Sequence, residues 1–181
     1  MTLKYKDELV RSMSFLAEDP RTIFLGQSVA YTGNAIYNTL VSVPEDRKIE
    51  TPVFEDVQMG LSTGLALEGF VPVTCYPRFD FLLLAINQLV NHLDKIQVMS
   101  NSEIQPRVII RTSIGSTTPL NGGIQHTQDY TSAFKDMLRH NVEVVLLEEP
   151  EQIFPAYERA LNREDCKSTL LIEYGDFYNE K

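Results

Sequence analysis

Short apolar runs alternate along the chain with longer segments in which apolar residues recur every three or four positions. Short runs of this kind are typical of buried strands, and the longer spacing is typical of helices with one face on a core. The pattern predicts strands at 22–26, 70–76, 107–112, 142–147 and 168–174. It predicts helices at 3–19, 34–43, 55–69, 79–98, 130–138 and 150–162.

This alternation of strands and helices predicts an α/β fold. We expect a single three-layer domain over residues 1–181, with a mostly parallel sheet and helices on both faces. Such sheets bind ligands beyond the carboxyl ends of their strands. The candidate loops are 26–34, 52–56 and 113–128. The last loop is longer than the usual connection of about 4–6 residues, which indicates a functional role.

Composition and charge narrow the possible partners. Hydrophobic residues make up 43% of the 181, and 25 acidic against 16 basic residues give a formal net charge of −9. Such a surface disfavours nucleic acid and anionic membranes. No apolar stretch is long enough to cross a bilayer, and the first residues lack a signal-type apolar region. Cys75 and Cys166 form neither a disulfide framework nor a metal-type spacing. We therefore expect a cytoplasmic protein.

Three residues are candidates for chemistry, and each also has an ordinary structural interpretation. Glu55, followed by Asp56, begins a predicted helix, where acids favour the helix dipole by about 0.3–1 kcal/mol. Phe81 fits the apolar core of the helix at 79–98. His126 lies beside glycines in the long loop, where histidines are commonly just exposed.

The sequence carries no phosphate-binding glycine loop, no nucleophile elbow and no zinc-type HExxH motif.

Two glycines stand inside the helix that Glu55 begins. Gly60 and Gly64 are four residues apart and share one helix face. Each glycine costs about 1 kcal/mol relative to alanine inside a helix, which close approach of another backbone or a ligand would offset. The spacing predicts that this helix is buried against something large, such as another subunit.

An ordered set of short motifs resembles the pyrimidine-binding domain of thiamine-diphosphate-dependent enzymes. The likeness is greatest to the beta subunit of the decarboxylating component of 2-oxo-acid dehydrogenase complexes, and it spans roughly residues 20–175. The motifs are Thr51-Pro52-Val53-Phe54-Glu55, Gly60-x3-Gly64-x-Ala66-x-Glu68-Gly69-Phe70-x-Pro72-Val73, Phe79-Asp80-Phe81, Ala85-x2-Gln88-x2-Asn91, Lys95-x3-Met99-Ser100, Pro106-x-Val108-x2-Arg111-x3-Gly115 and Gly123-x-Gln125-His126-x-Gln128.

The resemblance implies a role for each candidate residue. The glutamate at the place of Glu55 hydrogen-bonds a ring nitrogen of the cofactor's aminopyrimidine, and the aromatic residue at the place of Phe81 stacks on that ring. His126 corresponds to an active-site histidine that faces the substrate or the acyl-carrying partner. A carboxyl group on the pyrimidine favours its imine form, so that a proton can move along a short charge-assisted bond.

The sequence departs from the family pattern in two places. Relatives commonly have two acidic residues after the first strand's glycine, whereas this chain has Gln27 and Ser28. In the family the first of the two, a glutamate, belongs to an acidic path that links paired active sites. A glutamine cannot carry that charge. Family beta subunits also continue into a C-terminal domain, which we do not expect within these residues. A Gly-Asp-Gly motif for the cofactor's diphosphate and Mg²⁺ is missing as well.

We therefore expect one subunit of a split enzyme, active only with a diphosphate-binding alpha-type subunit that holds most of the thiamine diphosphate and Mg²⁺. The expected assembly is a homodimer or a heterotetramer, and the expected reaction is decarboxylation of a small 2-oxo acid with acyl or aldehyde transfer. Two alternatives remain open: a transketolase-like ketol transfer subunit, and a non-catalytic structural or regulatory subunit.

Overall fold

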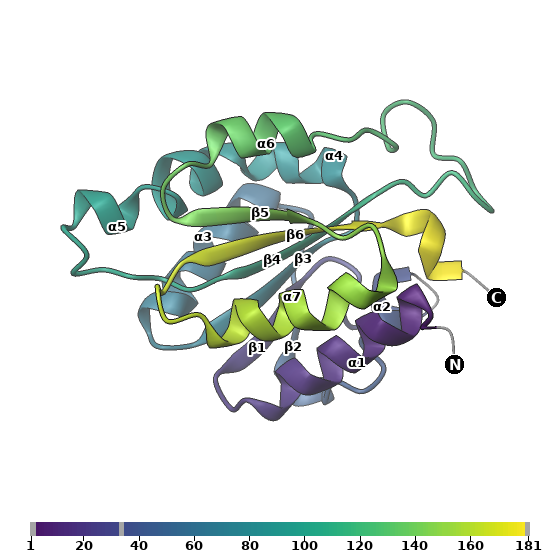
Figure 1. The fold of residues 1–181 in the computed structure, drawn as a ribbon, viewed down its shortest axis with the longest axis horizontal. Coiled ribbons are helices and arrows are strands. Elements are labelled where there is room, and N and C mark those ends of the chain that lie inside the picture. Colours follow the sequence, from purple (N-terminus) through teal and green to yellow (C-terminus); the bar gives the residue numbers. More distant parts are fainter. Residues whose placement is uncertain (1–2, 33–34, 180–181) are drawn as a thin grey trace.

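The computed structural model describes residues 3–32 and 35–179. Its centre is one sheet of six parallel strands in the order β2-β1-β3-β4-β6-β5 (Figure 1). The strands are β1 (Thr22–Gly26), β2 (Lys48–Glu50), β3 (Val71–Tyr76), β4 (Ile109–Ile114), β5 (Val142–Leu146) and β6 (Ser168–Tyr174). The predicted α/β class with a mostly parallel sheet is confirmed.

Helices cover both faces of the sheet and complete three layers (Figure 1). The first face carries α1 (Tyr5–Glu18), the short α2 (Ala35–Thr39) and α7 (Pro150–Asn162). The second face carries α3 (Glu55–Leu67), α4 (Phe79–Leu82) and α6 (Thr131–Met137). The shorter helical elements are η1 (Glu45–Arg47), η2 (Leu83–Ala85), η3 (Asn87–Leu93), α5 (Ile96–Met99) and η4 (Gly175–Asn179).

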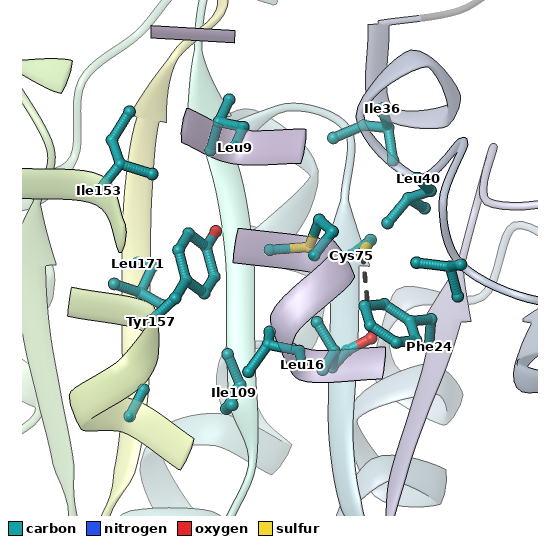
Figure 2. Close-up of a cluster of buried hydrophobic side chains, with 14 of the residues drawn as sticks. Leu9, Leu16, Phe24, Ile36, Leu40, Cys75, Ile109, Ile153, Tyr157 and Leu171 are labelled. Carbon is teal, nitrogen blue, oxygen red and sulfur yellow. Dashed lines mark hydrogen bonds between the residues drawn. The ribbon is translucent and has the colours of Figure 1, made fainter. Parts of the chain in front are cut away.

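Two hydrophobic clusters hold these layers together, one on each face of the sheet. On the first face, Leu9 and Leu16 of α1 and Tyr157 of α7 pack towards the strand residues Phe24 and Leu171 (Figure 2). The second cluster gathers Met59, Phe79, Leu89, Phe134 and Ile172. Burying such a side chain fully contributes about 1.5–3 kcal/mol relative to leaving it exposed. Strands that are covered on both faces read as the continuous apolar runs seen in the sequence.

A fully buried ion pair joins the neighbouring strands β4 and β6 and ties them to the first helix layer. Arg111 of β4 donates from Nε and Nη2 to the Glu173 carboxylate of β6 at 2.7 and 2.9 Å, and both side chains are inaccessible to solvent. The hydroxyls of Tyr157 and Tyr178 also donate to Glu173. Burial alone would lower the pKa of Arg111, but the Glu173 carboxylate outweighs it and holds that pKa well above its ordinary value.

The prediction of one continuous α-helix over 79–98 is wrong, because the segment is divided into several short helical elements. The segment changes from α4 to the 3₁₀ turn η2 and then to the π-helical η3, and a turn at Asp94 separates α5 from the rest. Asp94 is buried, and its carboxylate accepts backbone N–H groups from residues 139–142, at 2.9 Å from Asn141 N and 3.0 Å from Val142 N. These tertiary bonds hold the turn at Asp94 against the connection that precedes β5. A periodicity argument does not include them.

Two smaller elements also differ from the prediction. The expected helix at 34–43 is helical only over Ala35–Thr39, and its first predicted residue lies outside the described residues. After it, Leu40 and Val43 close turns with backbone bonds to Tyr37 and Leu40. The edge strand β2 was not predicted, because its three residues are not an apolar run. Within the described residues, no helix has the length and apolar character needed to cross a membrane.

Candidate active site

The carboxyl ends of all six strands meet at one edge of the sheet. Because β1, β3 and β4 are neighbours, the loops after Gly26, Tyr76 and Ile114 lie side by side there. Each candidate residue from the sequence follows one of the strands at this edge. The edge is also where open α/β sheets bind ligands.

Glu55 is the first residue of α3 and is 5% exposed. The side-chain amide of Gln27, after β1, donates to Glu55 Oε1 at 3.0 Å. The hydroxyl of Tyr76, at the end of β3, donates to the Glu55 backbone carbonyl at 3.2 Å. Burial raises the pKa of Tyr76, which keeps its hydroxyl a donor. Two neighbouring strand ends thus hold Glu55, one through its carboxyl group and the other through its backbone carbonyl.

The start of α3 is anchored to β3 through Gln58, one turn after Glu55. Its Nε2 donates to Thr74 Oγ1 at 2.9 Å and to the Cys75 carbonyl at 3.0 Å. Gly26 permits this close arrangement, since a Cβ at its position would lie 2.2 Å from the Cys75 carbonyl oxygen. Its φ of +145° also favours glycine. The glycine that ends β1 therefore brings Gln27 next to Glu55.

The loop after β1 is held by Glu50, a residue that the sequence analysis missed. The Glu50 carboxylate accepts three successive backbone N–H groups, from Ser28 at 2.7 Å, Val29 at 2.9 Å and Ala30 at 2.9 Å. Ser28 takes a left-handed conformation with φ +64° to make this possible. Glu50 ends the unpredicted strand β2, so no sequence signal pointed to it. The contact orients the loop that carries Gln27.

Phe81 and His126 are brought together although they are 45 positions apart in the chain. Their ring centroids lie 5.5 Å apart with an interplanar angle of 66°, an edge-to-face contact, and both residues are half-buried. His126 Nδ1 is buried without a hydrogen-bond partner in the described part of the chain. A buried ring nitrogen without a partner is available to a ligand.

Two side chains hold the long loop that carries His126. Arg78, two residues beyond β3, donates from Nη1 to the backbone carbonyls of His126 at 3.1 Å and Gly115 at 3.4 Å. Asp176, beyond β6, accepts four bonds of 2.6–3.1 Å from the backbone N–H and hydroxyl groups of Thr117 and Thr118. The sequence analysis missed both residues, because each acts on a loop far away in the chain.

Glu55 belongs to a different part of the same edge. Across residues 3–32 and 35–179, no hydrogen bond or ring contact links it directly to Phe81 or His126. Nor does any group of three His, Cys, Asp or Glu side chains in those ranges form a metal site. The edge therefore offers a buried carboxyl group on one side and an aromatic–histidine pair on the other.

Comparisons with known proteins agree with this architecture. The family model "Transketolase, pyrimidine binding domain" matches residues 11–176. The 2-oxoisovalerate dehydrogenase subunit beta of Bacillus subtilis is 24% identical over 98% of this chain and 51% of its own length. The mitochondrial pyruvate dehydrogenase E1 component subunit beta of Chaetomium thermophilum is 35% identical over 65% of this chain and 31% of its own length.

A solved structure described as a split gene transketolase, inactive beta4 tetramer, shares the fold. It aligns with a TM-score of 0.61 and 17% identity, over 96% of this chain and 51% of that chain. This chain spans about half the length, or less, of these relatives. Because the family model covers most of the chain, the protein belongs to the family of transketolase-type pyrimidine-binding domains.

Proposed function

We propose that this chain is a subunit of a heteromeric thiamine-diphosphate-dependent enzyme that decarboxylates a 2-oxo acid and transfers the acyl or aldehyde unit. The observation that carries the proposal is the Glu55 carboxyl group, buried at the sheet edge of a pyrimidine-binding domain with one oxygen held by a neutral amide. The likeness to dehydrogenase beta subunits supports the 2-oxo acid as substrate class.

The residues present at the edge fit an aminopyrimidine. A buried carboxyl group can share a proton with a ring nitrogen, a half-buried aromatic ring can stack on the heterocycle, and a histidine nitrogen without a partner can face the reacting substrate. We assign these roles to Glu55, Phe81 and His126. When bound, thiamine diphosphate supplies the stabilised carbanion that such reactions need.

Gln27 determines which oxygen of Glu55 we assign to the proton shared with the pyrimidine ring nitrogen. Its amide already donates to Oε1, so Oε2 is the oxygen we assign to the pyrimidine proton. An amide donor orients the carboxylate but cannot itself carry a proton away. In this proposal Glu55 therefore exchanges its proton with the bound pyrimidine, without a relay through residue 27.

The proposal requires a partner chain that holds the cofactor's diphosphate and Mg²⁺, because the sequence lacks the Gly-Asp-Gly motif. The outer face of α3 supports such a partner. Val57 and Leu61 are 63% and 43% exposed there, and Phe54 before them is 63% exposed. Apart from the helix's own backbone and the adjacent residues, no described atom lies within 4 Å of where a Gly64 Cβ would be. We assign this face, the α3 outer stripe, to subunit contact in a homodimer or heterotetramer.

The test is reconstitution with the diphosphate-binding subunit, comparing Glu55→Gln with Asp56→Asn. Asp56 is the exposed neighbour on the same first turn and is the matched control. We expect turnover of the 2-oxo acid to fall by about 10²–10⁴-fold in Glu55→Gln, the usual range for a lost acid–base group, and to stay near wild type in Asp56→Asn. Undiminished turnover in Glu55→Gln contradicts the catalytic role.

Ketol transfer is the alternative reaction, and the shared fold with a split-gene transketolase motivates it. The same reconstituted enzyme distinguishes the two, because only ketol transfer consumes a ketose donor. A non-catalytic subunit is the remaining alternative, motivated by Gln27 at a position that is acidic in relatives. If the partner binds but the cofactor does not, that alternative replaces our proposal.

A further inference from the structure

A cavity lies at the carboxyl edge of the sheet, between the ends of β1, β3, β4 and β6 and the start of α2. Its volume is about 160 Å³, several times the roughly 30 Å³ that one water occupies in the liquid. Residues at or just beyond the ends of four different strands line it, among them Ser28, Arg78, Ser113, Ser116 and Tyr178. None of the residues assigned above to the cofactor lines this cavity.

Arg78 gives the cavity its positive charge. Among the described residues, the hydrogen bonds from its side chain all come from Nη1, to the Gly115 and His126 carbonyls. No ion pair in residues 3–32 and 35–179 includes Arg78. A guanidinium carries five N–H donors in a planar fork that matches a carboxylate or phosphate. The donors on Nε and Nη2 therefore remain for a ligand.

The two acidic side chains that hold the loops lining the cavity are already engaged. Glu50 accepts three backbone N–H groups next to Ser28, and Asp176 accepts four donors from Thr117 and Thr118. Partial burial would raise the pKa of Asp176, but the bonds from Thr118 and Thr117 outweigh it and lower that pKa. Both acids are held by loop donors, and neither forms an ion pair with Arg78 in the described part of the chain.

The walls of the cavity are fixed before any ligand arrives. Tyr178 is held by its hydroxyl bond to Glu173, which is itself paired with Arg111. Ser113 Oγ donates to the Pro77 carbonyl at 3.0 Å. The backbone at Ser28 is held in its left-handed conformation by Glu50. Preorganised donors in a fixed cavity bind an anion with little loss of side-chain entropy.

We propose that this cavity binds a small oxyanion, the carboxylate or phosphate group of the substrate, with Arg78 as its charged partner. The assignment to the substrate rests on the proposed function; anion binding itself does not. Arg78 Nη1 also donates to the His126 carbonyl. An anion bound at Nε and Nη2 of the same guanidinium would therefore be coupled directly to the loop that carries His126. Ser28 and Ser116 are the hydroxyl donors we assign to the same anion.

The test uses the isolated chain, without cofactor or partner, titrated with oxamate and with inorganic phosphate by calorimetry and NMR. We expect saturable binding that weakens about ten-fold or more in Arg78→Gln, as for a lost charged hydrogen bond. Arg139→Gln is the matched control, since Arg139 is a 67% exposed arginine on the surface. Tighter binding of oxamate identifies a carboxylate site, and tighter binding of phosphate identifies a site for a phosphorylated substrate.

Equal affinity in wild type and Arg78→Gln overturns the proposal, as does the absence of saturable binding of either anion to wild type. Hydrogen exchange over residues 115–128 shows whether Arg78→Gln has released the loop. If it has, Ser116→Ala decides: a loss of a few-fold supports the cavity site, and full affinity overturns it. Failure of this experiment leaves the Glu55→Gln result unaffected, because that assay follows turnover in the reconstituted enzyme.

Discussion

Helices α3 and α7 are both 13 residues long and cover opposite faces of the same sheet, yet they are built in opposite ways. On α7, apolar side chains such as Ile153 and Leu161 are buried, and Glu151, Glu158 and Arg159 face solvent. On α3 the buried positions include Glu55, Gln58 and Ser62, and the exposed ones include Val57 and Leu61.

The difference shows which face of the molecule is suited to contact with water and which is suited to contact with another chain. An amphipathic helix such as α7 is stable with water on its outer side. Helix α3 buries Met59 in the second cluster but also buries Glu55 and Gln58, which bond to Gln27, Tyr76 and Thr74, and it leaves the apolar Val57 and Leu61 outside. An exposed apolar stripe of this kind marks an interaction surface. The helix that begins at the candidate site is the one suited to burial by a partner.

The largest expected effect comes from the ion pair beneath α7. Glu173→Gln leaves the Arg111 guanidinium buried without a counter-ion and weakens the bonds from Tyr157 and Tyr178. Removing one member of a buried pair destabilises proteins by about 3–5 kcal/mol. Urea unfolding followed by circular dichroism measures the change. The control is Asp136→Asn, in the exposed pair with Arg139, where we expect about 1 kcal/mol or less. Similar losses in the two variants would refute the contrast.

A direct comparison of the two helices gives the next effect. Ile153→Ala removes a fully buried side chain from α7 and is expected to cost about 2–5 kcal/mol of unfolding free energy. Leu61→Ala, on the 43% exposed side of α3, is expected to change the stability of the isolated chain by no more than about 0.5 kcal/mol. It is expected to weaken association with the partner in sedimentation experiments. Equal destabilisation of the isolated chain would show that the α3 outer stripe is part of its own core.

The smallest effect is a pH dependence at the end of α7. Hydrogen bonds from Arg163 lower the pKa of Asp165 from its usual 3.8 to about 2. A lowered carboxyl pKa in the folded state stabilises the protein above the unfolded value, and this stabilisation is lost as pH falls through about 2. Because the Asp165 side chain is 49% exposed, solvent screening limits the effect to a fraction of a kcal/mol. As pH is lowered from 5 to 2, the free energy of unfolding should fall more steeply in wild type than in Asp165→Asn. Superimposable curves for the two proteins would contradict the assignment.

The sequence predicted the parts of the fold that depend on local periodicity. Five of the six strands and the helices α1, α3, α6 and α7 lie where the apolar pattern placed them. The pattern failed at β2, which is short and half-exposed, and at the segment after Phe79, where Asp94 binds the backbone before β5. Both failures arise from contacts between residues far apart in the chain.

The candidate site divides in the same way. The sequence by itself determined Glu55, Phe81 and His126 as candidates, because the ordered motifs that contain them can be read without the structure. Only the tertiary structure decided that Gln27 holds Glu55, that Glu50 orders the loop beside it, and that Arg78 spans the histidine loop and a cavity. The physical reason is that hydrogen bonds act over about 3 Å of space, and the parallel sheet, not the order of the residues, brings these loop donors and acceptors within that distance.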